Sequence, residues 1–168
     1  NQLAAQAPAG CDALTVLPFG NGAERILAGS FTGASFDGID LVRHSRAHLL
    51  RAAQEGIAFS FLYGIDIMRD LGLSPSVIRA GRANLFLSPL FRQTLATITG
   101  ARIELFDTDG SLGAARGAAL GAGFYKDTSE TFTSLERVGV TLPEDSWKAA
   151  LTDAYARWKT NLETTLKQ

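Results

Sequence analysis

The fold is decided by residues 74–125, SPSVIRAGRANLFLSPLFRQTLATITGARIELFDTDGSLGAARGAALGAGFY. Val77-Ile78 is a short β-branched run that stops at Ala80-Gly81, and the apolar residues after it recur at helical spacing. Gly100 is typical of a helix end, and residues 103–106 then supply a second strand. These residues predict a parallel strand–helix–strand unit, followed by a helix built mostly of Gly and Ala.

The loop after the first of these strands, Ala80-Gly81-Arg82-Ala83-Asn84, is the most informative short run. Gly81 lets a backbone approach a nucleotide, Asn84 can hydrogen-bond a base or a ribose, and Arg82 can reach a phosphate. Loops at the carboxyl ends of strands in α/β sheets are where phosphorylated ligands dock. A plain turn, with Asn84 or Ser88 capping the next helix, is the alternative, and spacing alone favours the turn.

A long helix is predicted upstream, with Ser45 as its N-cap and Gly72 at its end, because apolar residues recur there at three- and four-residue steps. Gly56 and Gly64 lie on one face of this helix and are expected to let a neighbouring backbone come close. Residues 13–17 read as a buried strand that is broken at Pro18.

The end of the chain is predicted to be helical. Residues 129–138 read as a short helix, residues 140–142 as a connector, and Pro143 as the first residue of a final helix. The apolar stripe of that final helix includes Trp147 and Trp158, which could cover either the core or a homodimer interface.

Composition narrows the class of protein. The chain has 168 residues, enough for one domain with a core that needs no disulfides. It has no long apolar run, and 16 basic residues nearly balance 17 acidic ones, so we expect a soluble protein with no nucleic-acid or membrane partner. Cys11 is the only cysteine, which suits a reducing compartment, and we expect a cytoplasmic location. The first residue is Asn, so we expect the chain to begin inside a longer protein.

Several runs carry weak chemical signals. Residues 107–110, Asp-Thr-Asp-Gly, could place carboxylates near a metal, but a turn or helix cap is the favoured interpretation. His44 and His48 lack a third zinc ligand, so no metal site is expected. Glycines at four-residue steps, beginning at Gly113, predict a helix lying tight on the sheet. There is no P-loop and no arguable general base, so no catalytic residue is predicted in this chain and part of any enzyme machinery lies elsewhere.

Three ordered motifs resemble the C-terminal domain of the FGGY carbohydrate kinases. The first runs from Ala34-x-Phe36-x-Gly38-Ile39 to His48-Leu49 and on through Glu55-Gly56-Ile57-Ala58-Phe59. The second joins the Gly81 loop to residues 88–93, SPLFRQ, and the third is the Gly-Ala helix from residue 112 to residue 123. The chain departs from the family pattern at Ala80, where a Gly is usual, and by about three extra residues at 85–87.

The resemblance implies an α/β fold, an actin-like, ribonuclease-H-like ATPase domain with a mixed sheet flanked by helices. It implies ATP and Mg²⁺ as cofactors, and a sugar substrate, expected to be xylulose, that is bound by an N-terminal domain outside this chain. The cofactor-binding residues that it implies are Ala80, Gly81, Arg82, Asn84, Ser88 and Gly113. The alternative is a non-catalytic actin-like module that binds a nucleotide or a partner.

Overall fold

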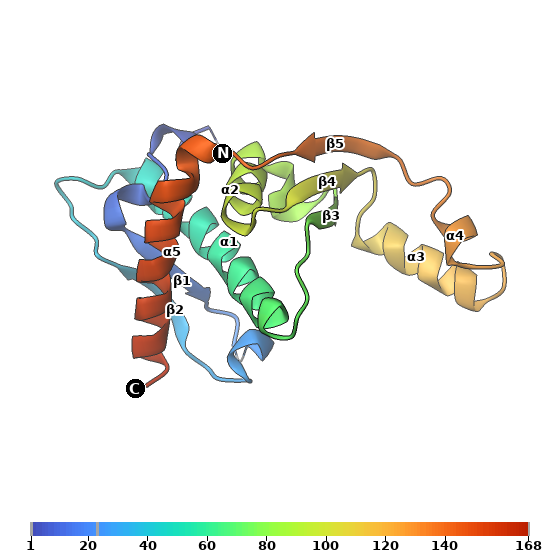
Figure 1. The fold of residues 1–168 in the computed structure, drawn as a ribbon, viewed down its shortest axis with the longest axis horizontal. Helices are drawn as coiled ribbons and strands as arrows, with labels where there is room; N and C mark the ends of the chain where they lie inside the picture. Colours follow the sequence, from blue (N-terminus) through green and yellow to red (C-terminus); the bar gives the residue numbers. More distant parts are fainter. Residues whose placement is uncertain (1, 23, 168) are drawn as a thin grey trace.

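Two small β-sheets and four helices of 11 to 25 residues organise residues 2–22 and 24–167, which the computed structural model describes (Figure 1). Strands β1 (Thr15–Phe19) and β2 (Gly33–Asp37) form an antiparallel pair. Strands β3 (Val77–Gly81), β4 (Arg102–Phe106) and β5 (Arg137–Thr141) form the second sheet, in that order. The β3–β4 pair is parallel and the β4–β5 pair is antiparallel, so the predicted mixed sheet is confirmed.

The long helices begin and end at residues that the sequence marks. Helix α1 (Arg46–Asp70) starts at a capping box, in which Ser45 and His48 exchange hydrogen bonds with each other's backbone. Helix α2 (Pro89–Thr99) starts at the hydroxyl of Ser88 and ends at Gly100, whose φ of 72° lies in the left-handed region. The remaining helices are α5 (Asp145–Thr165), α3 (Gly110–Gly121), α4 (Thr128–Thr131) and the 3₁₀ turns η1 (Ala4–Gln6), η2 (Cys11–Ala13), η3 (Arg25–Leu27) and η4 (Asn84–Leu87).

The main core lies where α1 and α5 meet β1. Trp158 of α5 is fully buried there, and its indole N–H donates to the carbonyl of Val16 at 2.9 Å. A Cβ at Gly56 would lie 2.2 Å from the same Val16 carbonyl oxygen, so the expected close approach of a backbone is confirmed at this residue. At Gly64 the nearest group is a side chain, that of Ile26, at 3.4 Å. Only one of the two glycines therefore admits a neighbouring backbone.

The predicted strand–helix–strand unit is confirmed between β3 and β4. Ile78 pairs with Ile103 in the parallel register, and α2 connects the two strands. Ile103 is fully buried against α1 and α2, in a cluster with Ala58, Phe91 and Leu95. One face of this sheet is therefore covered by helices.

Helices α3 and α4 form an arm that projects from the body (Figure 1). We predicted that the Gly-Ala helix lies tight on the sheet, and this is wrong. No residue of α3 is buried, and a Cβ at Gly113, Gly117 or Gly121 would meet no atom within 4 Å among the described residues. Gly and Ala offer little apolar area, so the sheet gains little by holding this helix against it.

Four further predictions are corrected near the chain ends. The helix predicted at 129–138 covers only Thr128–Thr131, and the predicted connector at 140–142 belongs largely to β5, because Val138 and Val140 alternate with Gly139 along the edge of β4. Pro143 lies before the final helix, which is capped by Glu144. Strand β1 continues through Pro18 to Phe19.

Candidate nucleotide site

A hollow lies where the parallel strands β3 and β4 end side by side. Gly81 is the last residue of β3 and Phe106 the last of β4, and they are paired in the register. The loops that follow them enclose a space of about 300 Å³. It is lined by Arg82, Asp107, Thr108, Asp109 and Leu112. Its position, at the carboxyl edge of two neighbouring parallel strands, is the position predicted for a ligand.

Gly81 allows the two loops to touch. A Cβ at this residue would lie 2.6 Å from the carbonyl oxygen of Thr108, which is closer than any side chain can come. The backbone N–H groups of Arg82 and Thr108 both donate to the carbonyl of Phe106, each at 2.9 Å. The first physical role of this glycine is therefore to bring the second loop against the first, and its contact with a nucleotide stays a prediction.

The hollow carries one basic and two acidic side chains. The guanidinium of Arg82 lies 3.2 Å from the carboxylate of Asp107, and both side chains are more than half exposed. Asp109 caps α3 by accepting the backbone N–H of Leu112 at 2.9 Å, which confirms the interpretation of this run as a helix cap. Because carboxylates accept hydrogen bonds and repel phosphates, this set suits hydroxyl and amino groups better than a triphosphate.

The remaining four predicted site residues, which are described next, are not among the residues that line the hollow. Ala80 is half-buried within β3, and Gly113 follows the lining residue Leu112 in the first turn of α3. Asn84 is exposed, and its φ of 50° is a left-handed conformation that Asn tolerates. Ser88 is buried, because it caps α2 and its hydroxyl donates to Gln54 at 3.0 Å. The capping alternative for Ser88 is thereby confirmed.

The three extra residues of the loop form most of the 3₁₀ turn η4. Phe86 of this turn packs edge-on against Phe91 of α2, with ring centres 5.5 Å apart, and against Phe61 of α1, with ring centres 6.3 Å apart. The carbonyl of Phe86 also accepts a hydrogen bond from Arg92. The insertion is therefore anchored on the helical layer.

Glu55, which belongs to the first of the three family motifs, takes part in a buried hydrogen-bond network that the sequence did not predict. The carboxylate of Glu55 accepts hydrogen bonds from Arg51 at 2.8 Å and from the backbone N–H of Gly10 at 3.1 Å, and the thiol of Cys11 lies 3.5 Å away. Burial raises the pKa of Glu55, and its hydrogen bond with Arg51 opposes that shift. Burial and the neighbouring Glu55 raise the pKa of the Cys11 thiol, which keeps it protonated. This network ties the N-terminal segment to α1.

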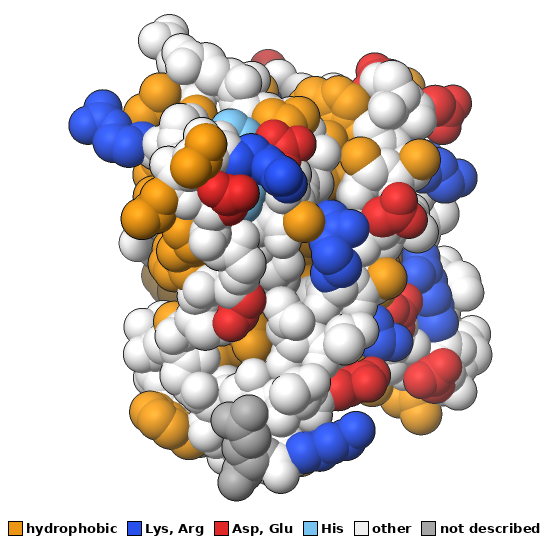
Figure 2. All heavy atoms as spheres, turned by 90° about the vertical axis from the view of Figure 1, so that its left-hand side faces the viewer, with side chains coloured by type: hydrophobic (Ala, Val, Ile, Leu, Met, Phe, Trp, Pro, Cys, Tyr) orange, Lys and Arg blue, Asp and Glu red, His pale blue; other side chains and the backbone are white. Residues whose placement is uncertain are grey.

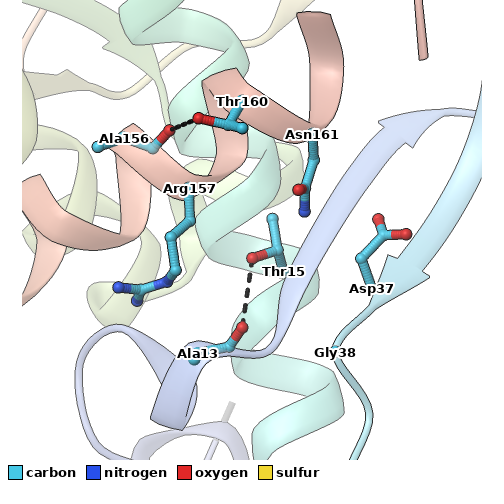
Figure 3. A pocket seen from close by; sticks show the side chains of 8 residues that line it. All are labelled: Ala13, Thr15, Asp37, Gly38, Ala156, Arg157, Thr160 and Asn161. Atoms are coloured by element: carbon cyan, nitrogen blue, oxygen red, sulfur yellow. Dashed lines mark hydrogen bonds between the residues drawn. The ribbon is translucent and has the colours of Figure 1, made fainter. Parts of the chain in front are cut away.

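A second hollow, of about 430 Å³, lies between α5 and the ends of β1 and β2 (Figure 3). Arg157 and Asn161 of α5 face Thr15 and Asp37 across it (Figure 3). The Nε atom of Arg157 is buried without a hydrogen-bond partner among the described residues. None of these residues was singled out from the sequence, because they come together only when the terminal helix crosses the strand pair.

The described residues include no group of three or more His, Cys, Asp or Glu side chains that could hold a metal ion. Within residues 2–22 and 24–167, no helix is long and apolar enough to cross a membrane.

On the face seen from the left of Figure 1, basic and acidic side chains lie next to one another, with apolar side chains between them (Figure 2).

Known proteins are similar to this chain in sequence and in fold. The model of the FGGY family of carbohydrate kinases, C-terminal domain, matches residues 1–124. The chain is 36% identical to a xylulose kinase of Haemophilus influenzae, over 96% of this chain and 33% of that protein. A gluconate kinase from Lactobacillus acidophilus superposes with a TM-score of 0.80 at 23% identity, over 98% of this chain and 34% of that one. A Plasmodium falciparum glycerol kinase with ADP superposes with a TM-score of 0.73 at 23% identity, over 99% of this chain and 33% of that one.

The class is therefore that of the carbohydrate kinases, and solved sugar kinases share this fold. The chain belongs to the FGGY family of carbohydrate kinases and carries its C-terminal domain. It spans about a third of the length of the curated relative described above.

Proposed function

We propose that this chain is the nucleotide-binding part of an ATP-dependent sugar kinase, which transfers the γ-phosphoryl group of ATP to xylulose. The observation that carries the proposal is the hollow at the carboxyl ends of β3 and β4, beside Gly81. The similarity to a xylulose kinase over 96% of the chain supports the choice of sugar.

The chemistry of the hollow suits the nucleoside end of ATP. A volume of about 300 Å³ is at the lower limit for ligand sites, which fits an adenosine better than a whole nucleoside triphosphate. Asp107 and Asp109 can accept hydrogen bonds from ribose hydroxyls or from the adenine amino group, while Arg82 can donate. Asn84, at the start of η4, and Gly113, in the first turn of α3, are further contacts in the proposal.

The phosphate end would then point away from these carboxylates, out of the hollow. The described residues include no group of three or more His, Cys, Asp or Glu side chains, so Mg²⁺ would enter with the nucleotide, bound mainly by its phosphates. We place the general base and the sugar site in a part of the protein outside this chain, because this chain spans a third of the length of its relative. Phosphoryl transfer depends on positioning, and closure of the two parts would exclude water from the reaction.

The test is a calorimetric titration of ATP into the full-length protein and two variants. Arg82→Ala removes the donor that lines the hollow, and we expect the dissociation constant for ATP to rise about tenfold. Gly81→Ala places a methyl group against the Thr108 carbonyl and separates the two loops, so we expect a similar or larger loss of affinity.

Arg43→Ala is the matched control. Arg43 is an exposed arginine whose partner is also an aspartate, Asp40, at 3.9 Å, and it lies in the loop before α1. Its removal should leave ATP affinity unchanged. If neither Arg82→Ala nor Gly81→Ala changes ATP affinity, the nucleotide does not bind in this hollow. Absence of any ATP binding by the full-length protein would favour a non-catalytic scaffold.

A further inference from the structure

Three arginines converge on one carboxylate on the outer face of the β3–β4–β5 sheet. Glu104 of β4 is buried, with 4% of its surface exposed. Its oxygens lie 3.2 Å from Nε of Arg79, 3.1 Å from Nε of Arg102 and 3.2 Å from Nη1 of Arg137. Each of the three strands thus contributes one arginine to a single acidic group.

The strand register explains this convergence. Arg79 of β3 is paired directly with Glu104, so the two side chains emerge on the same face. Arg102 lies two residues before Glu104 on the same strand, which also places it on that face. The residue between them, Ile103, points to the opposite face and is buried under α2. The arginines therefore occupy the face that α2 does not cover.

The cluster is left with an excess of positive charge. Three guanidinium groups face one carboxylate, and no other acidic partner of these three arginines occurs among the described residues. Each arginine uses a single nitrogen on Glu104, although a guanidinium offers five N–H donors. Their side chains keep 48% to 73% of their surface exposed. The unused donors are therefore accessible to a ligand.

A hollow of about 690 Å³ adjoins this cluster, between the sheet and the segment that joins α4 to β5. Its wall combines charged and apolar groups: Arg79, Glu104, Phe106, Phe132, Leu135 and Arg137. Half of the Phe132 surface is exposed. The volume lies within the range of small-molecule sites, and an apolar wall with a few convergent polar groups is the usual composition of such sites.

We infer that this hollow, which Arg79 and Arg137 line and Arg102 adjoins through Glu104, binds a phosphate dianion that carries an apolar or aromatic body. A dianion would balance the two uncompensated positive charges, and guanidinium groups bind phosphate oxygens through paired N–H donors. The apolar body would lie against Phe132 and Leu135. The phosphate has two possible sources, a separate small phosphate ester or the phosphates of a nucleotide seated beside Gly81.

The probe for this test is phenyl phosphate, titrated into the full-length protein and followed by calorimetry. We expect saturable binding that Arg79→Gln and Arg137→Gln each weaken about tenfold or more, because each removes one positive charge from the hollow. Glu104→Gln should tighten binding severalfold, since it removes the only negative charge of the cluster. A residue with a structural role alone would not change affinity in that direction.

Controls separate charge from apolar contact. Arg43→Gln, at an exposed arginine outside the sheet, should leave the affinity for phenyl phosphate unchanged. Phenol should bind much more weakly because it lacks the charge, and inorganic phosphate should bind more weakly because it lacks the ring. No saturable binding of phenyl phosphate, or equal affinity in the wild type and both arginine variants, would overturn the inference.

A second titration, with saturating ADP, distinguishes the two sources of the phosphate. Undiminished binding of phenyl phosphate assigns the hollow to a separate ligand, and competition assigns it to the nucleotide's phosphates. The site does not rest on the proposed kinase function. A protein that binds phenyl phosphate but no ATP would keep this inference and lose that proposal.

Discussion

Helices α1 and α3 both carry glycines at regular steps, but only α1 uses one to touch another part of the described structure. In α1, Gly56 lies directly against the backbone of β1. In α3, the three glycines have open space where a side chain would be. The residues around Gly56 include Phe59 and Glu55, which are themselves buried, whereas the neighbours in α3 are mostly exposed alanines. Glycine spacing therefore predicts a close contact only where bulky neighbours hold the helix in place.

The largest expected effect is that of Gly56→Ala. The new methyl carbon would lie 2.2 Å from the Val16 carbonyl oxygen, so α1 and β1 must move apart at the centre of the core. We expect the free energy of unfolding to fall by about 3 kcal/mol, the upper end for overpacked cores. Chemical denaturation of the full-length protein, followed by circular dichroism, measures this change.

Gly64→Ala is the control on the same helix, because its methyl group would meet only the flexible end of Ile26 at 3.4 Å. We expect it to change stability by less than about 1 kcal/mol, because Ala also has the higher helix propensity. Equal losses in the two variants would show that β1 is not held against Gly56 as described.

The sequence predicted those parts of the fold whose apolar residues face a core. The strand–helix–strand unit could be predicted because Ile103 and the α2 stripe of Phe91 and Leu95 pack on one another. Strand β5 was missed because Val138 and Val140 are about half exposed, and such a strand owes its place to backbone pairing with β4. The predicted position of α3 was wrong for a related reason, since a run of small side chains does not indicate whether another element packs against the helix.

The location of the candidate site could be predicted from the sequence, but the full set of residues that line it could not. The sequence identified Gly81 and Arg82 because they lie at the end of a strand. It did not show that Asp107 and Asp109 would come to the same hollow, since that depends on the parallel pairing of β3 with β4. The arginine cluster around Glu104 was missed for the same reason, as its arginines lie on three different strands.

Gly117→Ala tests α3, the other helix of the comparison, and should raise stability where Gly56→Ala lowers it. Gly117 lies in the middle of α3, with no atom near its missing side chain, so Ala there should stabilise the helix by about 1 kcal/mol. Because α3 makes few contacts with the body, we expect slower hydrogen exchange in α3 alone, by about fivefold, with no change in the core. Destabilisation by this substitution would mean that the glycine face of α3 is packed in the full-length protein.

The smallest effect should appear on acidification, at the joint between the arm and the body. Hydrogen bonds from Arg79 and Arg102 hold the pKa of Glu104 below its usual value, and Arg137 of β5 adds its charge. A carboxyl whose pKa is lowered by folding stabilises the protein above about pH 4, its unfolded value, and loses that contribution as the pH falls through the folded pKa. Below that pH, Glu104 no longer holds Arg137, so hydrogen exchange in β5 should accelerate before exchange in α1 does. The effect is small because the arginines are about half exposed and screened by solvent. Glu104→Gln should abolish this pH dependence, and a wild type that responds to acid no more than the variant would show that the charge of Glu104 does not fasten the arm to the sheet.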